Sequence, residues 1–303
     1  MNLLKESNYR KNNLNDLKGS FSENGYLYFR NFFDESVIVN LRNIIIDILK
    51  KESWIKNITD QVIPLLPVRK VGDIEFFKCI EAIMAKEEIH KFCNNSLILD
   101  FLEQFIGRGI IIHPRKTIRL IYPYLMNQEG LFLAHQDFYY VKGEIDTITI
   151  WIPLGNYPIE YGGLKILEGS HKKGLFPIKK DKSGEFLSCK VSDIEIKDHD
   201  WKQANYKIGD VLIFHSLTLH ETGINHSDEF RLSIDFRASA RNGLINKNQL
   251  FPCYYPKISA WESLTKNWID KNLISVPDES KLQDDSINPY DALNIKKSIF
   301  FNN

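Results

Sequence analysis

The fold is decided by one stretch, residues 131–140, which reads Leu131-Phe-Leu-Ala-His135-Gln-Asp137-Phe-Tyr-Tyr140. An apolar run leads into a histidine and an aspartate two residues apart, and aromatic residues follow. We expect a strand here, and because alternate residues of a strand point to the same face, His135 and Asp137 share one face. A third ligand would complete a 2-His-1-carboxylate triad, the ligand set of non-haem Fe(II) sites with open coordination positions.

The second half of the chain supplies a candidate for that third ligand. Residues 208–214 predict a strand, and the sequence His215-Ser-Leu-Thr-Leu-His220 follows it. Arg231 comes eleven residues after His220, a spacing that spans a turn and returns on a neighbouring strand. His220 then faces the metal while Arg231 points into the same cavity, where a guanidinium suits the distal carboxylate of 2-oxoglutarate. The alternative for Arg231 is a structural ion pair with an aspartate or glutamate.

Two further histidines are weaker candidates. A second His-x-Asp, His226-Ser-Asp228, lies in a polar run that predicts a hairpin turn, so we interpret it as surface. His215 lies five residues before His220, an odd spacing along one extended segment, so the two side chains face opposite sides. We therefore expect His215 to be structural.

The amino-acid composition limits which kinds of protein and of binding partner are expected. The chain has 303 residues, 43% of them hydrophobic, which suits one large domain with a substantial core. Lysine plus arginine and aspartate plus glutamate both number 39, and this balance does not favour nucleic acid or an anionic membrane as a partner. The first ten residues lack an apolar signal-peptide core, and no apolar run approaches the ~18 residues of a membrane span.

The cysteines agree with this interpretation. Four are present, and none forms a C-x-x-C or a zinc-ligand spacing, which is typical of reduced thiols in the cytoplasm. We therefore expect a cytoplasmic protein without nucleic-acid or membrane partners. The sequence does not predict the oligomeric state.

The pattern of predicted elements indicates the fold. Helices are expected at 35–51, 76–92 and 96–106, because apolar residues recur there every three or four positions or capping residues flank the run. Short strands follow without helices between them, at 109–113, 116–122, 131–140, 146–154, 163–167, 206–215 and 231–237. Helices followed by many short strands predict a mainly β fold with flanking α, a double-stranded β-helix (jelly-roll or cupin-like barrel) with N-terminal helices.

We expect a single domain across residues 1–303. Residues 20–108 form its mainly helical flank, and residues 109–240 form the barrel core, with a solvated surface insertion at 172–205. Residues 241–303 form a C-terminal extension with a helix at 257–272. The polar residues 1–20 are expected to be a loose arm or a frayed helix.

Several short motifs occur in a fixed order between about residue 20 and residue 240. They are Glu23-Asn-Gly-Tyr-Leu, Arg30-Asn-Phe-Phe33, His135-Gln-Asp137, Trp151, Gly163-Leu, Glu168-Gly-Ser-His171, Gly209-Asp210, and His220 with Gly223, Asn225, Ser227 and Arg231. Each is weak alone, but together the chain resembles the phytanoyl-CoA dioxygenase-like family of Fe(II)/2-oxoglutarate oxygenases.

The resemblance implies a set of roles. Iron would be held by His135, Asp137 and His220, and 2-oxoglutarate by Arg231, with Thr222 and Trp151 lining the cosubstrate pocket. The implied cofactors are Fe(II), 2-oxoglutarate and O2. His171 lies in what looks like a structural turn of the family and is not expected to be a ligand.

The resemblance also implies a reaction, which is hydroxylation of a small molecule with release of succinate and CO2. Related halogenases carry a small glycine or alanine where this chain has Asp137, so oxygen transfer is expected rather than halogenation. Two alternatives stay open. The same iron site could catalyse desaturation, epimerisation or cyclisation, or the protein could be a non-catalytic cupin-like metal-binding protein.

The substrate side is predicted from position alone. Residues 136–140 surround the ligand pair, so Gln136, Phe138, Tyr139 and Tyr140 are expected to line or support the substrate.

Basic side chains give a further indication of the substrate. Arg237 shares the face of Arg231 by period two, so it either binds an anionic substrate or pairs with Asp235. Of Lys116 and Arg119, which point to opposite faces of one strand, at most one faces inward. These residues favour a small anionic substrate.

Overall fold

The computed structural model describes residues 2–56, 61–70, 73–126, 133–180, 187–189, 201–252, 260–289 and 300. Its centre is a six-stranded sheet of mostly antiparallel strands that faces a four-stranded sheet. The large sheet has the order β2 (Glu6–Ser7), β3 (Tyr26–Phe29), β10 (Val211–His215), β5 (Ile148–Pro153), β12 (Arg231–Ala240) and β4 (Ile110–Ile121). The small sheet has the order β1 (Asn2–Leu3), β9 (Trp201–Gln203), β6 (Leu164–Leu167) and β11 (His220–Thr222).

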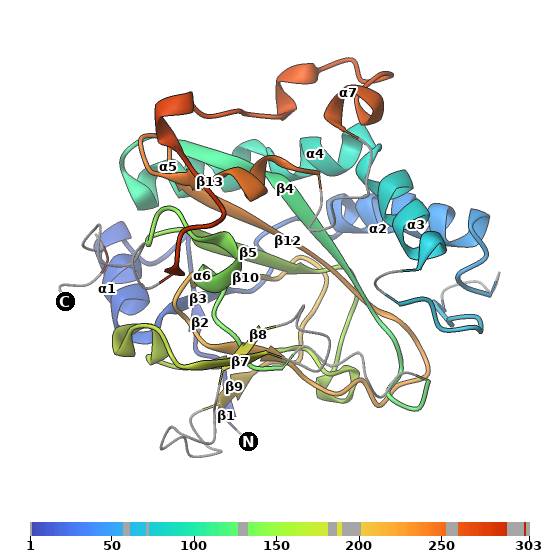
Figure 1. Cartoon of the computed structure of the whole chain (residues 1–303). Helices are drawn as coiled ribbons and strands as arrows, with labels where there is room; N and C mark the ends of the chain where they lie inside the picture. The colour runs from blue at the N-terminus through green and yellow to red at the C-terminus, as the bar shows by residue number, and fades with distance from the viewer. Residues whose placement is uncertain are drawn as a thin grey trace.

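The fold prediction is confirmed, since the chain has the two-sheet arrangement of cupin-like proteins with helices beside it. In Figure 1 helices α2 to α5 lie on one side of the large sheet, and β1 and β9 lie on the other. The described strands form separate sheets rather than one closed barrel. Two further sheets have two described strands each. They pair β7 (Ile178–Lys180) with β8 (Leu187–Cys189) and β13 (Ile245–Asn246) with β14 (Leu282–Gln283).

Strand β12 explains why both faces of the large sheet are buried. Its apolar residues alternate with polar ones, and Leu232, Ile234 and Phe236 join the main hydrophobic core. The five N-terminal helices contribute to the same core, so they pack against the outer face of the large sheet. The polar residues of β12 face the other way, into the space between the two sheets, and they are Arg231, Ser233, Asp235 and Arg237.

The helices form where apolar residues recur every three or four positions, and side-chain caps are present at the first and last of the five. They are α1 (Leu14–Asn24), α2 (Glu35–Lys51), α3 (Ile74–Met84), α4 (Glu87–Cys93) and α5 (Ser96–Ile106). In α5 the side chain of Asn95 accepts a hydrogen bond from the Leu97 amide, and Gly107 ends the helix with a φ of 72°. Its buried residues are Ile98, Leu102, Phe105 and Ile106, each worth roughly 1.5–3 kcal/mol of burial on folding.

Gly25 ends α1 and explains one of the short motifs. Its φ is 81°, which favours glycine, and a Cβ there would lie 2.4 Å from Nδ1 of His171. The His171 ring is fully buried, and its Nε2 lies 2.9 Å from the Ser22 carbonyl oxygen. His171 therefore joins α1 to the turn after β6, in agreement with the structural role expected for it.

Of the two alternatives predicted for residues 1–20, the loose arm was wrong. From residue 2 onward, β2 adds to the large sheet beside β3 and β1 adds to the small sheet beside β9. Helix α1 begins at Leu14. The polar composition hid these strands, since edge strands take part in sheets through backbone hydrogen bonds and need few apolar residues.

Other boundaries also differ from the predictions. The helix expected at 76–92 is two helices, α3 and α4, separated at Ala85 and Lys86. The strands expected at 109–113 and 116–122 are one strand, β4, with an irregularity opposite Phe236 and Ala238. Within the insertion predicted at 172–205, β9 belongs to the small sheet, so only part of that range is surface.

The C-terminal extension has less helix than predicted. Residues 257–259 of the helix expected at 257–272 lie outside the described residues, and α7 covers only Trp261–Leu264. No described helix is long and apolar enough to cross a membrane. Because one core unites the helices with the sheet, we propose that residues 1–303 form one domain.

Candidate active site

The three predicted ligands come together at one end of the sheets. His135 and His220 form an isolated β-bridge, and the His135 amide donates to the His220 carbonyl at 2.9 Å while the His220 amide donates back at 3.0 Å. Asp137 stands at the start of the short helix α6 (Phe138–Val141). The strand expected at 131–140 was therefore wrong where the structure describes it, from residue 133 onward. The chain turns after Gln136, and that turn aims the carboxylate back toward the imidazoles.

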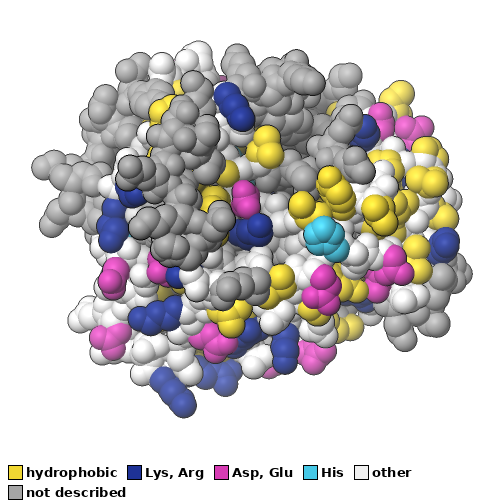
Figure 2. Space-filling model, turned by 90° about the horizontal axis from the view of Figure 1, so that it is seen from below, with side chains coloured by type: hydrophobic (Ala, Val, Ile, Leu, Met, Phe, Trp, Pro, Cys, Tyr) yellow, Lys and Arg dark blue, Asp and Glu magenta, His cyan; other side chains and the backbone are white. Residues whose placement is uncertain are grey.

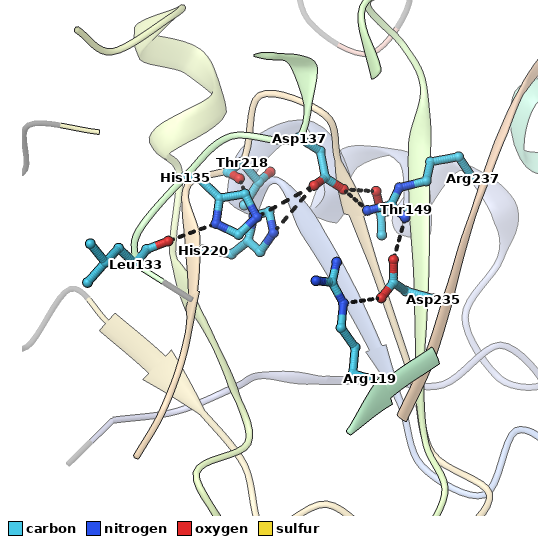
Figure 3. Close-up of polar contacts among 9 residues, drawn as sticks. All are labelled: Arg119, Leu133, His135, Asp137, Thr149, Thr218, His220, Asp235 and Arg237. Carbon is cyan, nitrogen blue, oxygen red and sulfur yellow. Dashed lines mark hydrogen bonds and ion pairs between the residues drawn. The ribbon is translucent and has the colours of Figure 1, made fainter. Parts of the chain in front are cut away.

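The geometry of the cluster suits a metal ion. One ligand atom from each of His135, Asp137 and His220 can be chosen so that all three lie within 4.8 Å of one another. Nε2 of His135 lies 3.8 Å from Asp137 Oδ1, and Nε2 of His220 lies 3.7 Å from the same oxygen. Figure 3 shows the two rings side by side with the carboxylate facing them. The three donors thus converge on one point.

Backbone carbonyls fix the orientation of both imidazoles. His135 Nδ1 donates to the Leu133 oxygen at 2.8 Å, and His220 Nδ1 donates to the Thr218 oxygen at 3.0 Å (Figure 3). With the proton on Nδ1, the lone pair of Nε2 is directed at the cluster. Burial lowers the pKa of His135 to about 3 and also lowers the pKa of His220, so both rings are neutral ligands near pH 7.

The carboxylate of Asp137 is equally fixed. Its Oδ2 accepts hydrogen bonds from the Thr149 hydroxyl and from Arg237 Nη2, the latter at 2.8 Å. Burial alone would raise the pKa of this carboxyl, but Arg237 and the two imidazoles hold it far below its usual range. Asp137 is therefore ionised, with Oδ1 turned toward the histidines. Two neutral imidazoles and one carboxylate fit Fe(II) in the 2-His-1-carboxylate arrangement.

Arg231 is buried between the sheets and is 1% exposed. Its Nη1 lies 3.4 Å from Ser233 Oγ, and its guanidinium carbon lies 5.9 Å from the centre of the Trp151 ring. Among the described residues no carboxylate forms an ion pair with Arg231, and its Nε has no hydrogen-bond partner. Burial lowers its pKa to about 10, so it stays charged at neutral pH. A buried cation without an acid is costly, and an anionic ligand would remove that cost.

Thr222 and Trp151 lie in positions that suit the predicted cosubstrate pocket. Thr222 follows His220 by two residues on β11 and so shares its face. Trp151 is buried on the inner face of β5, opposite Asp235 in the sheet register. It belongs to an aromatic cluster between the sheets that includes Tyr28 and Tyr206. Their contact with 2-oxoglutarate stays a prediction.

Three residues expected to line or support the substrate are buried in the structure, where they contact other parts of the protein. The Gln136 amide is fully buried and bridges three backbone groups, donating to Gly174 and Leu217 and accepting from Phe176. Phe138 is 0% exposed in the main core. The Tyr139 hydroxyl donates to the Phe176 carbonyl, and its ring is buried in a small core beside Cys189. The turn into α6 rotated these side chains away from the cavity. Tyr140 remains near the cluster, with its ring centre 5.7 Å from that of His135.

Arg237 was expected either to bind an anionic substrate or to pair with Asp235, and the pair is present in the structure. Its Nη1 pairs with Asp235 and its Nη2 pairs with Asp137, so the ion-pair alternative for Asp235 and Arg237 is the one present. Arg119 faces inward and donates from Nε to Asp235 at 2.8 Å, while Lys116 is buried on the other side of the strand. The sequence analysis missed Thr149, although its spacing of two residues from Trp151 placed both on one face.

Two other histidines that the sequence offered, His215 and His226, lie outside the cluster. His215 is fully buried, and its Nε2 lies 3.3 Å from Asp146 Oδ1, in agreement with a structural role. His226 and Asp228 lie in bends between β11 and β12, away from any strand, as the polar run indicated.

Comparisons with known proteins agree with this geometry. The family model described as "Phytanoyl-CoA dioxygenase (PhyH)" matches residues 21–233. The chain is 24% identical over 281 residues to "Phytanoyl-CoA dioxygenase, peroxisomal" of Bos taurus, covering 88% of this chain and 77% of that protein. It is 26% identical over 190 residues to the 1-deoxypentalenic acid 11-beta-hydroxylase of Streptomyces exfoliatus, covering 59% of this chain and 67% of that protein.

A solved structure supports the fold. The epimerase SnoN, in complex with Fe3+, alpha ketoglutarate and nogalamycin RO, is similar with a TM-score of 0.54 and 16% identity, over 77% of this chain and 85% of that one. The family match covers most of the chain and includes all three candidate ligands and Arg231. This protein therefore belongs to the phytanoyl-CoA dioxygenase (PhyH) family, as a dioxygenase that uses Fe(II), 2-oxoglutarate and O2.

Proposed function

We propose that this protein hydroxylates a small molecule that carries an anionic group, with His135, Asp137 and His220 as the iron ligands. The observation that carries the proposal is the convergence of two Nε2 atoms and Asp137 Oδ1 within one small cluster. Bound Fe(II), together with 2-oxoglutarate and O2, supplies insertion of one oxygen atom into a C–H bond, with succinate and CO2 as the other products.

The protein's own residues hold and orient the reactants. Arg231 binds the distal carboxylate of 2-oxoglutarate through its planar guanidinium, since no described acid occupies that position. Trp151 covers one face of that guanidinium, and Thr222 contributes a hydroxyl from β11. The aromatic cluster between the sheets excludes water from the pocket, which strengthens each of these polar contacts.

An anionic substrate is favoured by the charges that face the cavity. The inner face of β4 and β12 carries three arginines, which are Arg119, Arg231 and Arg237, and the acids that neighbour them are Asp235 and Asp137. The Arg119 side chain is 24% exposed, and in Figure 3 its guanidinium lies on the same side of Asp235 as the two imidazoles. On the face drawn in Figure 2, the described basic and acidic side chains are interspersed.

Epimerisation at the same iron site is a second candidate reaction, because SnoN, whose fold is similar, is described as an epimerase. Hydroxylation adds one oxygen atom to the substrate, whereas epimerisation leaves its mass unchanged, and desaturation or cyclisation removes two hydrogens. Mass spectrometry of the product therefore separates these outcomes. Family membership does not favour the non-catalytic alternative. The cytoplasmic location stays a prediction from composition.

The proposal is tested by anaerobic titration of the metal-free protein with Fe(II) and then 2-oxoglutarate. Wild type should develop the weak visible metal-to-ligand band, and His135→Ala and Arg231→Ala should not. His226→Ala is the matched control, because it alters the other His-x-Asp and should leave the band intact. A folded wild type without the band would overturn the proposed site.

A substrate screen follows if the band is present. Succinate release above the background without substrate identifies candidate small acids, and the mass of each product identifies the reaction. Uncharged analogues of an active acid should release less succinate. Equal turnover of the acid and its uncharged analogue would contradict the anionic substrate class.

A further inference from the structure

The two oxygens of the Asp137 carboxylate have different surroundings. Among the described residues, both hydrogen bonds to this carboxylate end on Oδ2, one from Thr149 and one from Arg237. Oδ1 faces the Nε2 atoms of the two histidines. The sheet register explains the pairing, because Arg237 of β12 lies directly opposite Thr149 of β5 and both side chains point to the same face.

Arg237 is itself held in place. Its other terminal nitrogen pairs with Asp235 Oδ1, and Asp235 Oδ2 accepts from Arg119 Nε at 2.8 Å. The side chains of Arg237 and Asp235 are 8% and 3% exposed. Figure 3 shows the resulting chain of contacts, which runs from Arg119 through Asp235 and Arg237 to Asp137. Arg237 therefore cannot follow Asp137 if the carboxylate rotates.

We propose that Arg237, anchored by Asp235, is a positioning residue that keeps Asp137 a one-oxygen metal ligand. This inference rests on the metal site of the proposed function. A carboxylate can bind a metal through one oxygen or both, and an oxygen that already accepts two hydrogen bonds, one of them from a cation, is a poor second donor. Keeping Oδ2 off the metal leaves coordination positions open for the cosubstrate.

The proposal predicts effects of opposite sign on the metal and on the cosubstrate. Arg237 places a positive charge beside a metal ligand, so its removal should leave metal affinity unchanged or increase it. Oδ2 would then be available to the metal, and 2-oxoglutarate, which needs two positions, should bind more weakly. A residue that only stabilised the fold would weaken both affinities when removed.

The experiment is anaerobic calorimetric titration with Co(II) and then 2-oxoglutarate for wild type, Arg237→Met and Thr149→Val. Thr149→Val removes a hydroxyl without changing charge, so it separates hydrogen bonding from the loss of a cation that attracts the dianionic cosubstrate. Both variants should bind Co(II) at least as tightly as wild type and 2-oxoglutarate about tenfold or more weakly. The visible absorption of Co(II) should lose intensity in both variants, because intensity falls as coordination number rises.

Lys116→Met is the matched control. Lys116 is an equally buried cation opposite Phe236 on the neighbouring strand, but its Nζ bonds the His113 and Pro114 carbonyls and not the cluster. Lys116→Met should leave the affinities for Co(II) and for 2-oxoglutarate unchanged. Arg237→Lys should restore part of the 2-oxoglutarate affinity lost in Arg237→Met, because one ammonium donor can still reach Oδ2.

Each other outcome counts against the proposal. If metal and 2-oxoglutarate affinities fall together, Arg237 and Thr149 only support the fold. If 2-oxoglutarate affinity is unchanged in both variants, Oδ2 does not compete for the metal. If wild type binds neither Co(II) nor 2-oxoglutarate, the metal site of the proposed function is itself wrong, which the wild-type titration shows before any variant is made.

Discussion

His135 and His220 exchange two backbone hydrogen bonds, and their ring centres lie 4.2 Å apart. Residues 85 positions apart in the chain are thereby fixed as neighbours by their own backbone groups. The backbone bridge sets the distance between the two Nε2 donors, and the carbonyls of Leu133 and Thr218 set their direction. Both donors are thus held in an arrangement that suits one ion.

The first prediction concerns the stability that the metal adds. A ligand that binds only the folded protein, at 100 times its dissociation constant, stabilises it by about 2.7 kcal/mol. Mn(II) under these conditions should raise the free energy of unfolding of wild type by that amount. His220→Ala should abolish the increase because it removes a ligand, and His226→Ala should retain it. Denaturant unfolding with and without Mn(II) measures the difference; an equal gain in His220→Ala would contradict the site.

The second prediction concerns Arg231. Arg231→Lys keeps the charge but loses the planar pair of donors, and a charge-assisted hydrogen bond contributes about 1.5–3 kcal/mol. The dissociation constant of 2-oxoglutarate should therefore rise at least about tenfold, while metal affinity stays the same. Anaerobic titration of the metal-loaded protein measures both. Arg241→Lys is the control, since Arg241 follows β12 on the exposed side of a turn and should have no effect.

The third prediction separates Gln136 from the substrate. Gln136→Leu would leave the Gly174 and Leu217 carbonyls and the Phe176 amide without their partner, and each buried unpaired group costs about 1–3 kcal/mol. We expect a loss of several kcal/mol in the free energy of unfolding, and unchanged substrate KM in the protein that remains folded. Gln61→Leu, at an exposed position, should unfold like wild type. A raised KM without loss of stability would restore the original interpretation of Gln136.

The fourth prediction concerns Lys116 and pH. Burial lowers the pKa of Lys116 from 10.5 to about 8, so between these values the unfolded chain binds a proton that the folded chain does not. Stability must therefore rise with pH across that window, by roughly 3 kcal/mol for this group. Tyrosines and cysteines also titrate there, so the measured quantity is the difference between wild type and Lys116→Met. That difference should change by this amount from pH 8 to pH 10.5, in favour of wild type at high pH. A constant difference would contradict the prediction.

The sequence was sufficient to predict the cluster of candidate ligands, because residue types and spacing are local properties. His135 and Asp137 are two residues apart, His220 follows an apolar strand, and Arg231 begins the next one. The alternation on β12 also assigned Arg231 and Arg237 to one face, since period two does not depend on the rest of the fold. The order of helices and short strands was enough for the two-sheet architecture.

Tertiary structure decided what each side chain near the cluster touches. Residues 136–139 are adjacent in the sequence, but the turn into α6 directs them differently. Asp137 points toward the two imidazoles, and Gln136, Phe138 and Tyr139 are buried in the interior. Whether Arg237 meets a substrate or a carboxylate depended on the register that sets it opposite Thr149 and near Asp137, 100 residues earlier. Contacts between distant segments follow from the packing of whole sheets, and a local pattern carries no information about which partner that packing brings.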